Sequence, residues 1–423
     1  MNEYLEVEFD IKPTKKGLLS GYTVSFKDCI CIEGVETKSS SQILKGYKPS
    51  FDSFVVKKVK EEGGHIIGKT KQDEFGFGSF GLNHKEPPRN PLDNKRVCGG
   101  SSSGSAGISK VLDNHIAIAE STGGSIVNPA AFCGVVGFCP SYGLVSRHGL
   151  LDYGTSLDKI GVISKDVLSV LKGLEVISSY DGKDSTQKKL KPENFSKLKA
   201  KKDFKIGIPK EYLDCEEFVK ESFLKVVDLL TKKGIQVDFI SLENNFKYSV
   251  SCYYLIACSE ASTNLAKYSG LRYGIQEDPR GIDFNDYFKQ VRSKHFSTEA
   301  KRRIILGTFA RMEGNKEDFY DKALMVRNML LLEYKKVFEK YDLILHPTMP
   351  ILPPKIDEAK KLDPKTVYNM DLLTVGSNLS GLPHASIPYF NNNNLPIGVM
   401  VTGNSFEEKK IAEFLLYLEE VLK

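Results

Sequence analysis

The chain has 423 residues, a length that suits one large α/β domain or two to three ordinary domains. Hydrophobic residues make up 41% and charged residues 27%, which excludes a disordered protein. The net charge of +5 permits an RNA partner without requiring one, because dedicated nucleic-acid binders carry a denser basic surface. No apolar run reaches the roughly 18–20 residues that span a bilayer, and the N-terminus lacks a signal-peptide pattern. We therefore expect a cytoplasmic protein.

The eight cysteines and seven histidines are scattered along the chain. They form no CxxC or HExxH motif and no cluster with zinc-ligand spacing. The sequence therefore favours buried, reduced thiols and predicts no metal site.

The first part of the chain alternates between short strands and helices. The expected elements, in chain order, are a strand pair over 17–34, a helix over 51–62, a buried strand over 64–70 and a strand over 115–120. Residues 82–107 are rich in Pro, Asn, Gly and Ser, and predict an ordered functional loop that leads into a helix near 105–112.

Residues 178–205 are polar and rich in lysine, with almost no hydrophobic periodicity. This pattern is typical of an inter-domain linker or of a surface excursion, and we assign it as an excursion within a single domain, 1–423. The lysines also suggest an RNA-binding segment, but the pattern favours a solvated surface.

The remainder of the chain again alternates. A strand is expected at FKIGIP, helices over 214–233, 252–268 and 299–340 (divided near Gly314), a strand in YDLILHPTMP, a helix over 370–382, a strand over 395–402 and a closing helix over 406–422. Helices and strands alternate over most of the chain, which indicates an α/β fold.

Two Gly-Ser segments, CGGSSSGSAG at 98–107 and STGGSIVNP at 121–129, carry the strongest chemical signal. A flexible linker does not fit, because an apolar helix and strand lie between the segments. A phosphate loop does not fit either, because Ser105 stands where the pattern requires lysine. The remaining interpretation is a cradle of backbone N–H groups around an anion, such as an oxyanion hole.

An oxyanion hole needs a nucleophile and a base. Ser101 and Ser125 each follow two glycines, and a serine hydroxyl reacts only when a base takes its proton. Lysine can be that base, because burial weakens its hold on the proton. Lys27 lies in an otherwise apolar strand and is the best candidate, although pairing with Asp28 or a place on an edge strand would also explain it.

These motifs together resemble the amidase signature family. The matching segments are FKD at 26–28, GGSSSGSA at 99–106 and TGGSIVNP at 122–129, with the family spacing of 24 residues from Ser101 to Ser125. The resemblance implies a single domain with a central mixed β-sheet covered by helices on both faces. It also implies a Ser125 nucleophile, with Ser101, after a cis peptide bond, bridging it to the base Lys27. Backbone N–H groups of Thr122, Gly123, Gly124 and Ser125 would hold the oxyanion.

Longer segments resemble the A subunits of glutamine-dependent aspartyl/glutamyl-tRNA amidotransferases. The segments are GKTKQDEFGFGS, RNPLDNKRVCGGSSSGSA, SEASTNLAKYSGLRYG, KRRIILGT and YDLILHPTMP. The resemblance implies a ligase-complex subunit that hydrolyses glutamine and supplies ammonia to a B subunit, braced by a C subunit. The B subunit would amidate mischarged tRNA with ATP and Mg²⁺, and this chain would need no metal or cofactor and no membrane.

The same resemblance implies that Tyr253, Arg303 and Asp371 bind the substrate glutamine. A zwitterion needs a cation for its carboxylate and an anion for its ammonium, which suits this pair of charges. Alternatives remain for each residue: Arg302 could be the contact, Tyr253 could be core, and Asp371 could cap the following helix.

Two positions depart from the family pattern. The family has Asp before TGGS and Arg after GGSI, whereas this chain has Ser121 and Val127, which suggests that a paired salt link was replaced as a unit. The segment before Lys27 is also short for the family. Two rival functions stay open, a free-standing amidase and a catalytically silent scaffold, and the sequence does not choose between Glu-tRNA(Gln) and Asp-tRNA(Asn).

Overall fold

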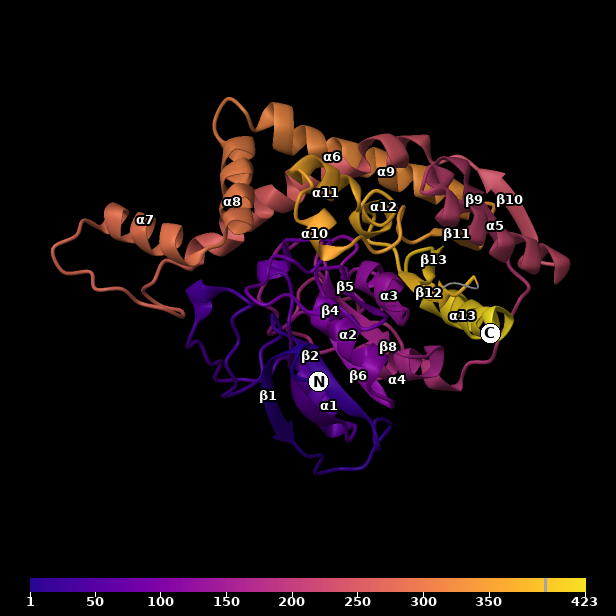
Figure 1. The fold of residues 1–423 in the computed structure, drawn as a ribbon, viewed down its shortest axis with the longest axis horizontal. Helices are drawn as coiled ribbons and strands as arrows, with labels where there is room; N and C mark the ends of the chain where they lie inside the picture. The colour runs from indigo at the N-terminus through magenta and orange to yellow at the C-terminus, as the bar shows by residue number, and fades with distance from the viewer. Residues whose placement is uncertain (392–393) are drawn as a thin grey trace.

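A mixed β-sheet of eleven strands runs through the molecule in the computed structural model, which describes residues 1–391 and 394–423 (Figure 1). Its strand order is β1-β3-β2-β6-β8-β7-β12-β13-β11-β9-β10, with parallel pairs around β2 and β9 and antiparallel pairs elsewhere. The strands are β1 (Leu5–Ile11), β2 (Thr23–Lys27), β3 (His65–Thr70), β6 (His115–Ser121), β7 (Val136–Cys139), β8 (Lys159–Ser164), β9 (Lys205–Pro209), β10 (Gln236–Ile240), β11 (Leu343–Pro347), β12 (His384–Tyr389) and β13 (Ile397–Gly403). A separate hairpin is formed by β4 (Arg89–Asn90) and β5 (Asp93–Val97).

Helices cover both faces of this sheet, which confirms the predicted α/β architecture. One face packs against α1 (Phe54–Glu61), α4 (Val167–Ile177), α5 (Glu217–Lys232) and α13 (Glu408–Leu422). The other packs against α2 (Ser103–Val111) and α3 (Val127–Cys133). An outer group comprises α6 (Glu243–Asn264), α7 (Phe284–His295), α8 (Thr298–Arg311), α9 (Lys322–Phe338), α10 (Ile356–Ala359), α11 (Pro364–Asn369) and α12 (Val375–Leu379), and α7 projects from one end (Figure 1).

Strands β2 and β6 lie side by side in the interior of the sheet and carry the candidate site at their carboxyl ends. Every residue of β6 is buried, as expected for a strand covered on both faces. The two strands are parallel, with Phe26 opposite Ile118, so Lys27 and Glu120 lie next to each other at the carboxyl ends of the two strands. Side chains from distant parts of the sequence therefore meet where these strands end.

The predicted strand pair over 17–34 is wrong in its second half. Only Thr23–Lys27 forms a strand, because the backbone turns after Lys27 and the Ile30 N–H donates to the Lys27 carbonyl at 2.9 Å. The expected helix over 370–382 is also shorter, Val375–Leu379. The elements that were not predicted include the strands β1, β7, β8, β10 and β12 and the helices α4, α7, α10 and α11.

The lysine-rich segment 178–205 connects α4 to β9 with little regular structure. It is nevertheless attached to the domain, since the Phe195 ring is buried and Asp184 pairs with Arg147 at 3.1 Å. The segment therefore packs along the domain instead of separating two. None of the described helices has the length and apolar character to cross a bilayer.

Helices α6 and α8 approach each other closely at Gly307. A Cβ atom added there would lie 1.8 Å from the Cys258 carbonyl oxygen, so only glycine fits without moving a helix. Arg303 lies one turn before Gly307 on the same face of α8. The close approach of the helices at Gly307 therefore helps to place the Arg303 side chain in the interior.

We expect Gly307→Ala to lower the free energy of unfolding by about 1–3 kcal/mol, because the added methyl group must push two packed helices apart. Urea unfolding followed by circular dichroism measures this. Thr308→Ala, at the exposed neighbouring position, is the control and should change it by less than about 0.5 kcal/mol. Equal effects of the two substitutions would contradict the packing argument.

Candidate active site

The amine of Lys27 is fully buried and donates three hydrogen bonds. Its Nζ donates to Ser101 Oγ at 2.7 Å, to the Glu120 carbonyl oxygen at 2.9 Å and to Glu120 Oε2 at 2.8 Å. Asp28 instead pairs with Lys69, at 3.1 Å, and β2 lies between β3 and β6. Neither a Lys27–Asp28 pair nor an edge-strand position therefore explains this lysine.

The first Gly-Ser segment presents Ser101 to that amine. The Gly100–Ser101 peptide bond is cis, as the family resemblance predicts. A Cβ atom on Gly100 would lie 2.2 Å from Asp73 Oδ2, which makes glycine necessary there. The Asp73 N–H donates to the Ser101 carbonyl oxygen at 3.1 Å, so the segment is held from both sides.

The second Gly-Ser segment forms the turn between β6 and α3 and carries Ser125. The Ser102 N–H donates to the Ser125 carbonyl oxygen at 3.3 Å, which joins the two segments. Asn378 Nδ2 donates to the carbonyl oxygens of Thr122 and Leu157, and the Asn128 N–H donates to the Gly124 carbonyl oxygen at 2.8 Å. These bonds fix the carbonyl groups of the turn.

Two adjacent tyrosines on α6 connect this turn to the predicted substrate-binding residues. Tyr253 is buried; its hydroxyl donates to Thr122 Oγ1 at 3.3 Å, and a Cβ atom on Gly123 would lie 3.1 Å from its Cζ. The Tyr254 hydroxyl donates to Asp371 Oδ2 at 2.7 Å. Burial raises the pKa of the Asp371 carboxyl above its usual range. Asp371 precedes α12 without being its capping residue.

Arg303 is buried and Arg302 is partly exposed, which separates the two candidate contacts. Arg303 Nε donates to Glu299 Oε1 at 2.9 Å and its Nη1 donates to the Tyr153 hydroxyl at 2.6 Å. Its guanidinium lies 5.1 Å from the ring centre of Tyr254, the residue that also binds Asp371. The structure thus brings Arg303 and Asp371 together around one tyrosine, whereas Arg302 pairs with Glu299 nearer the surface.

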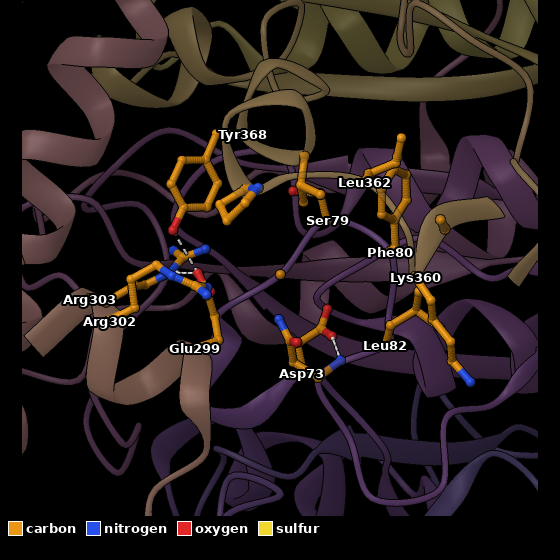
Figure 2. A pocket seen from close by; sticks show the side chains of 15 residues that line it. Asp73, Ser79, Phe80, Leu82, Glu299, Arg302, Arg303, Lys360, Leu362 and Tyr368 are labelled. Carbon is orange, nitrogen blue, oxygen red and sulfur yellow. Dashed lines mark hydrogen bonds and ion pairs between the residues drawn. The ribbon is translucent and has the colours of Figure 1, made fainter. Parts of the chain in front are cut away.

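A cavity of about 340 Å³ opens beside Arg303 (Figure 2). Arg303, Glu299 and Tyr368 gather on one side of it, and Asp73 approaches from below in this view. Its other lining residues are Gly78, Ser79, Phe80, Leu82, Asn83, Arg302, Ala359, Lys360, Leu362, Pro364 and Val367. Ser125 and Asp371 are not among them. Both are almost fully buried, at 6% and 7% exposure, so the candidate reacting centre lies outside this cavity.

Two carboxyl groups of the site were not singled out from the sequence. Glu120 stands in the apolar strand HIAIAES, and a lone carboxylate in such a strand is the signal that could have identified it. Asp73 lies in the polar segment KTKQDEF, which gives no such signal. Burial raises the pKa of Asp73 to about 7, although the N–H groups of Asn83 and Gly81 donate to it at 2.7 and 3.1 Å.

The two departures from the family pattern are both uncharged and buried. The Ser121 hydroxyl donates to the Gly123 carbonyl oxygen at 3.1 Å, and Val127 packs in the cluster between the sheet, α2 and α3. A charged residue at only one of these positions would be buried without its partner, which costs several kcal/mol. Losing both together avoids that cost.

Comparison with known proteins identifies the family of the chain. The Amidase family model matches residues 6–412. The chain belongs to the amidase family. The A subunit of the glutamyl-tRNA(Gln) amidotransferase from Halothermothrix orenii is 42% identical over 99% of this chain and 88% of its own length. The protein of the same name from Archaeoglobus fulgidus is 40% identical over 94% of this chain and 86% of its own length.

A solved structure of a member of this family also superposes closely. The crystal structure of the corresponding A subunit from Thermotoga maritima, again of a glutamyl-tRNA(Gln) amidotransferase, aligns with a TM-score of 0.82 and 37% identity. The alignment covers 99% of this chain and 87% of that one. The amidase fold therefore extends over nearly the whole chain.

The raised pKa of Asp73 predicts a pH-dependent contribution to stability. An aspartate in the unfolded chain has a pKa of 3.8, so between about pH 4 and pH 7 the folded state binds the proton more tightly. The contribution of Asp73 to the free energy of unfolding therefore falls as the pH rises through this range. Urea unfolding at pH 5 and pH 8 should show that Asp73→Asn loses less stability than the wild type over the same interval. Identical pH slopes for the two proteins would contradict the prediction.

Proposed function

We propose that this chain is the glutamine-hydrolysing subunit of a glutamyl-tRNA(Gln)/aspartyl-tRNA(Asn) amidotransferase. The observation that carries the proposal is the hydrogen bond of 2.7 Å between Lys27 Nζ and Ser101 Oγ beside the Ser125 turn. A buried lysine that reaches a serine next to a glycine-rich turn supplies the base and the anion-binding backbone that acyl transfer needs.

In the proposed reaction Ser125 attacks the side-chain amide of glutamine. Its proton passes to Ser101, and Ser101 passes its own proton to the amine of Lys27. The N–H groups of Thr122, Gly123, Gly124 and Ser125 stabilise the oxyanion, and the returned proton leaves with ammonia. Water then hydrolyses the glutamyl ester by the same route, which frees Ser125.

The charges near the cavity favour an amino-acid substrate. Arg303 offers a cation for the glutamine carboxylate, and Asp371 offers an anion for its ammonium group. Both contact Tyr254, and the neighbouring Tyr253 contacts the turn that carries Ser125. Helix α6 therefore contacts both the proposed substrate-binding residues and the proposed reacting centre. An apolar amide would gain nothing from such a pair of buried charges.

The partners follow from the relatives, which are named as A subunits of amidotransferases. In the proposed complex, B and C subunits join this chain in the cytoplasm. The B subunit uses ATP and Mg²⁺ to amidate mischarged tRNA with the ammonia that this chain releases. In the proposed reaction, the hydrolysis of glutamine uses only the side chains and backbone of this chain.

The deciding experiment measures ammonia release from glutamine by the purified chain, alone and with B and C subunits, ATP and mischarged tRNA. Activity that rises in the complex and falls at least about a thousandfold in Ser125→Ala would support the proposal, because a lost nucleophile leaves only the oxyanion cradle and binding. Strong hydrolysis of simple amides by the lone chain, with glutamine a poor substrate, would favour a free-standing amidase. Inactivity in every assembly would favour a scaffold.

Substitutions at the two arginines separate substrate binding from surface charge. We expect Arg303→Lys to raise the KM for glutamine about tenfold or more, because lysine cannot hold Glu299, Tyr153 and a carboxylate together. Arg302→Lys should change the KM less than about threefold, since Arg302 is partly exposed. Initial rates over a range of glutamine concentrations measure both. A larger effect at Arg302 would assign the contact to that residue.

A further inference from the structure

Glu120 is the one carboxylate among the described residues that lies within hydrogen-bond distance of the Lys27 amine. It stands on β6, next to β2, and contacts the amine through both its carbonyl oxygen and its carboxylate. Strand alternation turns its side chain to the face opposite that of Ser121. Glu120 therefore does not replace the aspartate that the family carries at position 121.

The hydrogen bonds of Lys27 leave no vacant position for an incoming proton. A lysine ammonium has three N–H donors, and Ser101 Oγ, the Glu120 carbonyl oxygen and Glu120 Oε2 accept all three. To take a proton from Ser101, Lys27 must first direct a lone pair at Ser101 and give up one proton. The carboxylate 2.8 Å away is the acceptor in position to receive it.

We propose that Glu120 is the final proton acceptor of a relay that runs from Ser125 through Ser101 and Lys27. One Lys27 N–H bond breaks as a Glu120 Oε2–H bond forms, and Lys27 then takes the Ser101 proton while Ser101 takes that of Ser125. The Ser125 Oγ–carbon bond forms, the oxyanion gains one negative charge and Glu120 loses one. The reverse transfers deliver the proton to the leaving ammonia. This inference rests on the proposed role of Ser125 as nucleophile.

The surroundings of Glu120 leave part of its carboxylate without a partner among the described residues. The residue is 3% exposed, and its Oε1 has no hydrogen-bond partner among the described residues, so a full negative charge there is poorly solvated. The titratable groups that face Lys27 and Glu120 from the neighbouring elements are Cys29, Asp73, Cys139 and Asp158. Burial, and then the charge of Glu120, raise the pKa of Asp158 well above its usual range. Glu120 thus lies among buried acids, with the Lys27 amine in direct contact with it.

The relay predicts a change in pH dependence that a structural role would not produce. With Glu120 present, a proton can leave Lys27 for the carboxylate as Lys27 takes one from Ser101, so Ser125 stays reactive in mildly acidic solution. With glutamine at this position, the base must be neutral Lys27, and reactivity should appear only at higher pH. The acid limb of the profile should therefore move upward in Glu120→Gln by at least about one pH unit.

The experiment follows labelling of Ser125 by phenylmethylsulfonyl fluoride between pH 5 and pH 10, read by intact mass, with Ser125→Ala to show where the label is attached. At pH 6 we expect Glu120→Gln to react at least about tenfold more slowly than wild type, and at pH 10 within about threefold. Glu408→Gln is the matched control: it too is a buried glutamate, which accepts from the Ser141 N–H at 2.8 Å, away from the site, and should follow the wild type.

A loss of the same factor at every pH, or no loss, would overturn the relay. Glu120→Asp keeps a carboxyl group and guards against misfolding of Glu120→Gln; its acid limb should stay within about half a pH unit of wild type, and an upward displacement would also overturn the relay. If the labelling rates show the pH dependence expected of the relay but the chain does not hydrolyse glutamine, the proposed function alone would be refuted. A wild type whose Ser125 is never labelled would refute the nucleophile and, with it, the relay.

Discussion

Enclosing the amine of Lys27 is the constraint on which the rest of the site depends. A buried amine must find hydrogen-bond partners inside the protein, and the three partners of Lys27 come from two different segments of the chain. One is the serine after a cis peptide bond, and the others are the carbonyl and carboxyl oxygens of Glu120 on the neighbouring strand. Parallel pairing of β2 with β6 brings them together at the same edge of the sheet.

The residues that carry short, ordered motifs were predictable from the sequence. Lys27, Ser101 and Ser125 belong to such motifs, and the structure places Lys27 and Ser101 in direct contact and joins the Ser101 segment to that of Ser125. The two carboxyl groups were missed, because Asp73 lies in a polar segment that gives no local signal and Glu120, a lone carboxylate in an apolar strand, meets its partners only in the folded chain. For the same reason the choice between Arg302 and Arg303 needed the burial of each side chain, since both belong to one helix turn.

Hydrophobic periodicity predicted part of the fold. The buried strands over 64–70 and 115–120 appear as β3 and β6. Strand β1 at one edge of the sheet was missed although its apolar and charged residues alternate as in a half-buried strand, and α7 was missed because it projects from the domain with few buried residues. The strand expected to follow Lys27 fails, because the chain must turn there to bring Lys27 to the end of its strand.

The positions of the site residues along the chain have a consequence for its synthesis. A ribosome completes Lys27, Ser101 and Ser125 in the first third of the polypeptide, whereas Arg303 and Asp371 emerge much later. Strand β6 also lacks one of its neighbours until β8 has been made. A partly translated chain therefore holds the proposed nucleophile and base without the groups proposed to select a substrate, which are added only when the later helices have been made.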